Sequence, residues 1–197
     1  MKTKGFTLIE LLVVLGVLTI LFSIGIYNIT QQTEYTHLDL ASKRMTDILN
    51  LARKNAIAGQ MMSTCDRMNG YKIITDINSS QTTMKAECSS GDVQALTYTF
   101  NTVPGIVITQ FNMMDVTDAV WGYDLTSFSF KNISGLISVK QAGSGNILYP
   151  SENQRVRIVI KNTNTNMCSQ FRINSTGFVN DCKIDSCNNL STCYVNP

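Results

Sequence analysis

Residues 2–10 read Lys-Thr-Lys-Gly-Phe-Thr-Leu-Ile-Glu and open an apolar run that continues to Ile29. Between Phe6 and Ile29 the only acidic or basic side chain is that of Glu10. At ~1.5 Å per helical residue this run spans roughly 36 Å, which exceeds the ~30 Å hydrocarbon core of a bilayer. Because an unpaired carboxylate is costly in such a segment, the run predicts a membrane-crossing helix with a functional acidic residue.

Two simpler interpretations of this segment remain open. An ordinary secretory signal peptide also begins with lysines and an apolar stretch, and Ser23-Ile24-Gly25 offers a small-x-small cleavage site. A plain signal anchor has the same outline. Neither accounts for an acidic residue inside the apolar run, or for the order of residues 5–10.

The junction Gly5-Phe6, followed by Glu10, resembles the class III signal of type IV prepilins and pseudopilins. The resemblance implies that a prepilin peptidase removes the leader, residues 1–5, and that Phe6 is then N-methylated. It also implies that Glu10 acts in filament assembly. The implied partners are other pilin or pseudopilin subunits, the peptidase, an inner-membrane assembly platform and, before assembly, membrane lipid.

Charged residues on either side of the apolar run predict its orientation. Lys2 and Lys4 precede the run, whereas Glu34 and Asp39 follow it. By the positive-inside rule, we expect a single-pass membrane protein with a cytoplasmic N-terminus and an extracytoplasmic head, which later joins an extracellular or periplasmic filament. Loss of the two leader lysines would leave 14 of the 16 basic side chains against 14 acidic ones, so bulk charge does not favour nucleic acid.

The chain has six cysteines, all beyond the apolar run, where an oxidising compartment allows disulfides. Six thiols allow about 15 connectivities. Sequence proximity favours Cys65–Cys88, Cys168–Cys182 and Cys187–Cys193, and a loop of about 20 residues closed this way contributes roughly 3 kcal/mol. Zinc binding is the weaker alternative because there is no Cys-x-x-Cys and the sole histidine is His37. Free thiols are the third possibility. The disulfide candidates are Cys65, Cys88, Cys168, Cys182, Cys187 and Cys193.

Beyond the membrane segment, small and apolar residues recur with the period of an amphipathic helix. The stripe consists of Leu38, Ala41, Met45, Ile48, Ala52 and Ala56. Gly59 is a suitable stop for this helix. The predicted organisation is therefore a leader (1–5), a transmembrane and assembly helix (6–29), its amphipathic continuation (30–58) and a disulfide-containing β-rich head (59–197).

The head shows short runs of β-branched and aromatic residues separated by Asn, Ser and Gly, which predict antiparallel strands. We predict strands at Tyr71–Thr75, Thr82–Cys88, Ala95–Phe100, Ile106–Phe111, Thr126–Lys131, Leu136–Gln141, Arg155–Lys161, Ser169–Asn174 and Phe178–Asn180. The tail beyond them has little periodicity. The fold class is therefore α+β, a long N-terminal helix packed on an antiparallel β-sheet or two-sheet head, which is the pilin fold that the resemblance implies.

Two further segments resemble the weak signatures of GspH/FimT-type minor pseudopilins. They are Asn50–Ala58, at the end of the predicted helix, and Phe171–Val179, near the C-terminus. We expect Ala52 and Ala56 to pack against the sheet, and the adjacent Arg53 and Lys54 to be solvated.

No motif for catalysis is present. The sequence lacks Gly-x-Ser-x-Gly, His-Glu-x-x-His, a phosphate loop and a dinucleotide fingerprint, so we expect no enzyme activity, no cofactor and no metal. Oxygen-bearing side chains cluster near the C-terminus, but their spacing matches no calcium loop, and a polar turn is the preferred interpretation. They are Asn180, Asp181, Asp185 and Asn188.

DNA binding is the low-ranking alternative. Some members of this family bind DNA through a basic motif after a Thr-Gly turn, but here that segment, Gly177–Asn180, has no arginine. A small patch of Arg155, Arg157, Arg172 and Lys183 would still be available to phosphates.

The sequence thus predicts a minor type IV pilin or pseudopilin, a structural subunit of a pilus or type II secretion pseudopilus. The alternatives are a DNA-capturing or adhesive minor pilin at a filament tip, and a membrane-anchored β-domain binding module.

Overall fold

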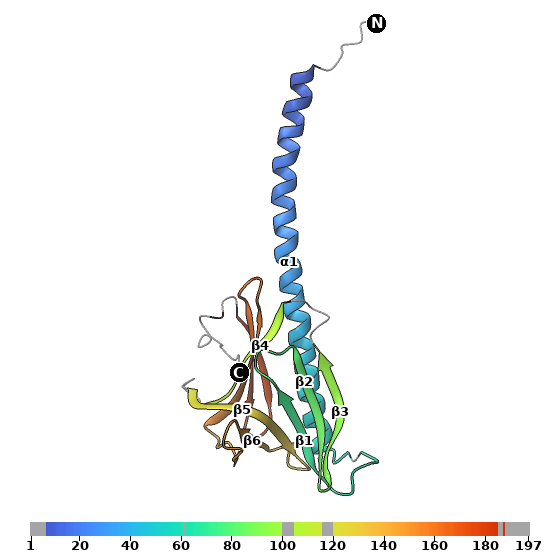
Figure 1. Cartoon of the computed structure of the whole chain (residues 1–197), viewed down its shortest axis with the longest axis vertical. Helices are drawn as coiled ribbons and strands as arrows, with labels where there is room; N and C mark the ends of the chain where they lie inside the picture. Colours follow the sequence, from blue (N-terminus) through green and yellow to red (C-terminus); the bar gives the residue numbers. More distant parts are fainter. Residues whose placement is uncertain (1–6, 61, 100–104, 116–119, 185–186, 188–197) are drawn as a thin grey trace.

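A single long helix and a curved antiparallel sheet make up the computed structural model, which describes residues 7–60, 62–99, 105–115, 120–184 and 187 (Figure 1). Helix α1 runs from Leu8 to Ile57. Its N-terminal half projects away from the head, whereas its C-terminal half lies along the sheet (Figure 1). This arrangement confirms the predicted α+β class.

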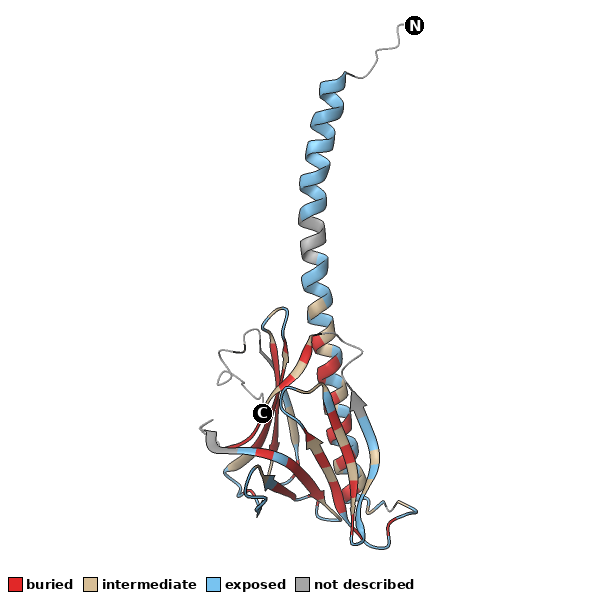
Figure 2. Cartoon of the chain, viewed as in Figure 1, coloured by how far each residue is buried: buried red, intermediate tan, exposed pale blue. Residues whose placement is uncertain are grey.

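The burial of α1 changes sharply along its length (Figure 2). The large apolar side chains between Leu8 and Phe22 are 40–81% exposed. Among the helix residues whose burial is described, Leu38 is the first buried one. All six residues of the predicted amphipathic stripe, from Leu38 to Ala56, are at most 4% exposed and belong to the core. The head therefore begins to cover the helix near Leu38.

The C-terminus of α1 is closed by two backbone hydrogen bonds. Gly59 has φ 61°, a left-handed conformation that glycine adopts without a Cβ penalty. Its N–H donates to the carbonyl of Ala56 at 3.1 Å, and the N–H of Gln60 donates to that of Asn55 at 3.0 Å. This is the Schellman pattern, and it confirms the predicted stop at Gly59.

Within the described residues, ten strands follow the helix. Their hydrogen-bonded order is β10-β9-β8-β4-β5-β1-β2-β3, with β6 on β5 and β7 on β6. The strands are β1 (Met68–Thr75), β2 (Gln81–Cys88), β3 (Gly91–Thr99), β4 (Ile106–Asp115), β5 (Val120–Lys131), β6 (Ile137–Gln141), β7 (Ile147–Leu148), β8 (Gln154–Asn162), β9 (Cys168–Asn174) and β10 (Val179–Ile184).

Strand β5 joins the two halves of the sheet. Near its start, Val120 and Asp124 pair with β4, and near its end, residues 127–131 pair with β1. Phe128 and Phe130 of β5 are buried and stack edge-to-face at 5.3 Å between ring centroids. One apolar core therefore extends under both halves and against α1.

Several strands differ in extent from the sequence prediction: β3 begins at Gly91 rather than Ala95, and β5 begins at Val120 rather than Thr126. Strand β7 was not predicted, and β10 continues to Ile184, into the tail that showed little periodicity. Hydrogen bonding to β9, rather than alternation of side chains, holds β10: Val179 pairs with Ile173 and Ile184 with Cys168.

Candidate assembly site at the helix N-terminus

The first turn of α1 contains Glu10, the residue predicted to act in assembly. Thr7 is the N-cap, with extended φ −80° and ψ 148°. Its backbone N–H and its hydroxyl both donate to Oε2 of Glu10, at 2.9 and 2.8 Å. The N–H of Glu10 in turn donates to the Thr7 hydroxyl at 3.4 Å. The two side chains thus form a capping box, which satisfies N–H groups that the first turn leaves without helical partners.

Sequence reasoning missed the role of Thr7, although the pattern for it is present. Thr7-Leu8-Ile9-Glu10 is a threonine followed three residues later by a glutamate, directly before an apolar run, which is the signature of a capping box. The predicted processing residues Gly5 and Phe6 lie outside the described residues.

The two carboxylate oxygens of Glu10 differ in their contacts. Oε2 accepts both bonds from Thr7, whereas Oε1 accepts none from the described residues. Ile9, Val13 and Val14 line a shallow apolar hollow with Glu10. A carboxylate oxygen in an apolar setting pairs most favourably with a cation, so the site is suited to receive a positive group from another molecule.

The apolar half of α1 is uncovered in the single chain. Across the part of the chain that the structure describes, no helix is both long and apolar enough to cross a membrane.

The disulfides of the head agree with the predicted pairing in one place and correct it in another. Cys65 and Cys88 are bonded, with Cα atoms 5.5 Å apart. Cys168 is bonded to Cys187, not to Cys182. Because Cys187 is bonded to Cys168, the predicted Cys187–Cys193 pairing is excluded as well. Cys182 is also disulfide-bonded, and Cys193 lies outside the described residues.

The register of β9 and β10 explains the correction. Cys168 pairs with Ile184. Cys182 pairs with Gln170, which lies two residues after Cys168 on β9. The N–H of Cys187 donates to the carbonyl of Asn166, near the start of β9, at 3.2 Å. Cys187 is thereby brought to Cys168.

Two arginines of the candidate DNA patch are buried. Arg157 and Arg172 are each 5% exposed and pair across β8 and β9. Nε of Arg157 donates to Oδ1 of Asn112 at 3.0 Å. Because phosphate binding needs exposed cations, these two side chains do not contribute to a basic surface.

The two segments that resemble GspH/FimT-type pseudopilins meet in the structure. The guanidinium carbon of Arg53, near the end of α1, lies 5.9 Å from the ring centroid of Phe178, in the β9–β10 turn. Arg53 is partly buried, which corrects its predicted solvation, whereas Lys54 is exposed as predicted. This contact places the turn against the helix but does not by itself identify the subfamily.

Comparison with known proteins gives one match. Residues 1–26 match the prokaryotic N-terminal methylation motif, which contains the Gly5-Phe6 junction and Glu10. No curated protein and no solved structure matches the chain. The N-terminal segment is thus similar to that of type IV prepilins, which supports a type IV pilin-like protein.

Proposed function

We propose that the chain is a minor type IV pilin or pseudopilin, a structural subunit of a pilus or of a type II secretion pseudopilus. The observation that carries the proposal is the carboxylate of Glu10, which is placed in the first turn of a helix whose apolar side chains are uncovered. In a filament, the apolar halves of neighbouring helices would cover one another, because burial of apolar surface is the main favourable term in association.

Processing creates the partner for Glu10. Cleavage after Gly5 by a prepilin peptidase leaves Phe6 with a new amino group, which is then methylated. In a staggered bundle, Oε1 of Glu10 would accept a hydrogen bond from the Phe6 amine of a neighbouring subunit, while Oε2 keeps the bonds from Thr7. Since either charge is costly to bury alone, this pairing would favour one register over others.

Before assembly, residues 6–29 would lie in the inner membrane with the head outside the cytoplasm, and the subunit would be passed to the assembly platform. N-terminal sequencing of protein from the native host tests the processing step. We expect a start at methylated Phe6, and we expect Gly5→Val to remain uncleaved because a β-branched side chain crowds the cut. A start near Ile26 would instead identify an ordinary signal peptide and contradict the proposal.

Two variants separate the capping role of Glu10 from its role in assembly. Glu10→Gln preserves a capping box, because glutamine also serves at this position, but it removes the charge. Thr7→Ala removes the cap and preserves the charge. Each variant is expressed with the other filament subunits, and sheared filaments are separated from membranes.

We expect both variants to be cleaved and present in membranes at wild-type levels. Glu10→Gln is expected to be depleted from the filament fraction, whereas Thr7→Ala is expected to enter filaments. Depletion of Thr7→Ala alone would show that the cap, and not the charge, is what assembly requires.

A further inference from the structure

A polar hollow lies on the face of the sheet that points away from α1. In the register of β1, β5 and β6, Lys72 is opposite Ser129, which is opposite Ser138, and Ser127 is opposite Lys140. Directly paired residues point to the same face, as do residues two apart in a strand, so these five side chains share one face. The alternating residues of the same strands face the core.

The three serines lie at the bottom of this hollow. Ser127, Ser129 and Ser138 are only 4–5% exposed, and all three line the hollow. The hollow has a volume of about 160 Å³. Since a water needs roughly 10–15 Å³ of such space, it holds on the order of ten waters. Serine hydroxyls that line such a hollow are available to water or to a ligand.

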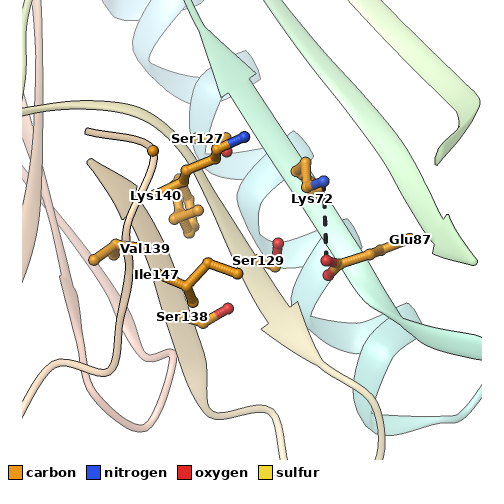
Figure 3. A pocket seen from close by; sticks show the side chains of 10 residues that line it. Lys72, Glu87, Ser127, Ser129, Ser138, Val139, Lys140 and Ile147 are labelled. Atoms are coloured by element: carbon orange, nitrogen blue, oxygen red, sulfur yellow. Dashed lines mark ion pairs between the residues drawn. The ribbon is translucent and has the colours of Figure 1, made fainter. Parts of the chain in front are cut away.

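Charged side chains form the walls of the hollow (Figure 3). Nζ of Lys72 lies 2.8 Å from Oδ2 of Asp92 and 3.9 Å from Oε1 of Glu87. Glu87 is also paired with Lys131 at 3.4 Å. Lys140, by contrast, has no ion pair with any described residue. One cation of the hollow therefore remains uncompensated.

We propose that this hollow binds a single acidic sugar unit, such as a uronic acid residue of a glycan. The serine hydroxyls both donate and accept, which matches ring hydroxyls. The ammonium of Lys140 would pair with the sugar carboxylate, and the carboxylate of Glu87 would accept from a hydroxyl. Ile147 supplies an aliphatic wall for the C–H face of the ring.

An inorganic anion fits the same site less well. Glu87 would repel it, and neither the volume of the hollow nor the apolar wall at Ile147 would be used. A drug-sized ligand is too large, because such ligands occupy pockets of about 300–1,000 Å³. The inference does not depend on the proposed role in filaments, since it concerns the head alone.

The test uses the full chain in a detergent without a sugar headgroup. Ligand-observed NMR titrations measure binding of methyl glucuronoside, methyl glucoside and inorganic phosphate. We expect millimolar affinity for the glucuronoside and at least tenfold weaker binding of the other two. Ser129→Ala is expected to weaken binding of the glucuronoside about fivefold, and Ser138→Ala serves as a second variant of the same kind.

Lys140→Gln is expected to weaken binding of the glucuronoside about tenfold and to leave that of the glucoside unchanged, because only the former has the carboxylate. Lys54→Gln, an exposed lysine on α1, is the matched control and is expected to have no effect. Equal binding of phosphate and glucuronoside would overturn the proposal in favour of a plain anion site. Absence of glucuronoside binding to the folded wild type, or an equal effect of Lys54→Gln, would also overturn it.

Discussion

The side-chain amide of Asn162 donates two hydrogen bonds to Glu34, one to the backbone carbonyl at 3.2 Å and one to Oε2 at 2.8 Å. Asn164 donates to the other carboxylate oxygen at 3.0 Å. Asn162 is fully buried at the end of β8, and Glu34 lies one turn before the buried Leu38 of α1. These contacts attach the helix to the head where the helix leaves it.

Replacement of Asn162 tests this attachment. In Asn162→Ala both bonds to Glu34 are lost, and so is the bond from the N–H of Asn164 to Oδ1 of Asn162. We expect the free energy of unfolding to fall by about 1–3 kcal/mol, because buried groups lose their partners. Hydrogen exchange of the full chain should rise in residues 30–38. The exposed Asn153→Ala is the control, and equal exchange in the two variants would contradict the proposed attachment.

The same contacts predict a pH dependence. Hydrogen bonds from Asn162, and then from Asn164, lower the pKa of Glu34 from its ordinary value of 4.5. A depressed pKa means that the stabilisation is present above 4.5 and is lost as the pH falls through the folded-state value. Exchange in residues 30–38 should therefore increase in acid for the wild type. Glu34→Gln should show a flatter response over that range, and a parallel response would exclude Glu34 as the titrating group.

Much of the fold was predictable because local patterns determine it. The stripe from Leu38 to Ala56 has helical spacing, and the whole stripe is buried against the sheet. The run of β-branched residues in Arg155–Lys161 predicted β8 in the same way, and the left-handed conformation at Gly59 needs only a glycine. The Thr7–Glu10 capping box was equally local, and the pattern alone would have been sufficient to predict it.

Other features depend on contacts between segments distant in sequence. The alternation of Arg157 with apolar residues indicated an exposed arginine, yet Arg157 is buried beside Asn112. The alternation identifies two faces of β8 but does not show that both are covered. Likewise, the hollow at Ser129 requires the pairing of β1, β5 and β6, which no single segment encodes.

The disulfide pairing can be checked by tryptic mapping without reduction. Cleavage at Lys161, Arg172 and Lys183 places Cys168, Cys182 and Cys187 on three separate peptides. The structure predicts that the 162–172 peptide is joined to the 184–197 peptide through Cys168 and Cys187. If 162–172 is joined to 173–183 alone, Cys168 is bonded to Cys182 and the pairing in the structure is wrong.

Gly177 and Gly143 have similar backbone conformations but different surroundings. Both are left-handed, with φ 76° and 78°, so alanine brings a similar backbone strain of about 1–2 kcal/mol at either position. A Cβ at Gly177 would lie 2.5 Å from the carbonyl oxygen of Gly135 and 3.1 Å from the ring of Phe130, whereas a Cβ at Gly143 would meet nothing within 4 Å.

Gly177→Ala should therefore be more destabilising than Gly143→Ala by about 1–3 kcal/mol, the usual cost of overpacking. Urea unfolding of the full chain measures this difference, and the shared strain cancels in the comparison. The turn at Gly177 carries Phe178 against Arg53, so the environment of Phe178 should also change in Gly177→Ala. Equal stability of the two variants would show that the loop at Gly135 moves aside freely, and that the helix, this loop and the β9–β10 turn are not packed as one unit.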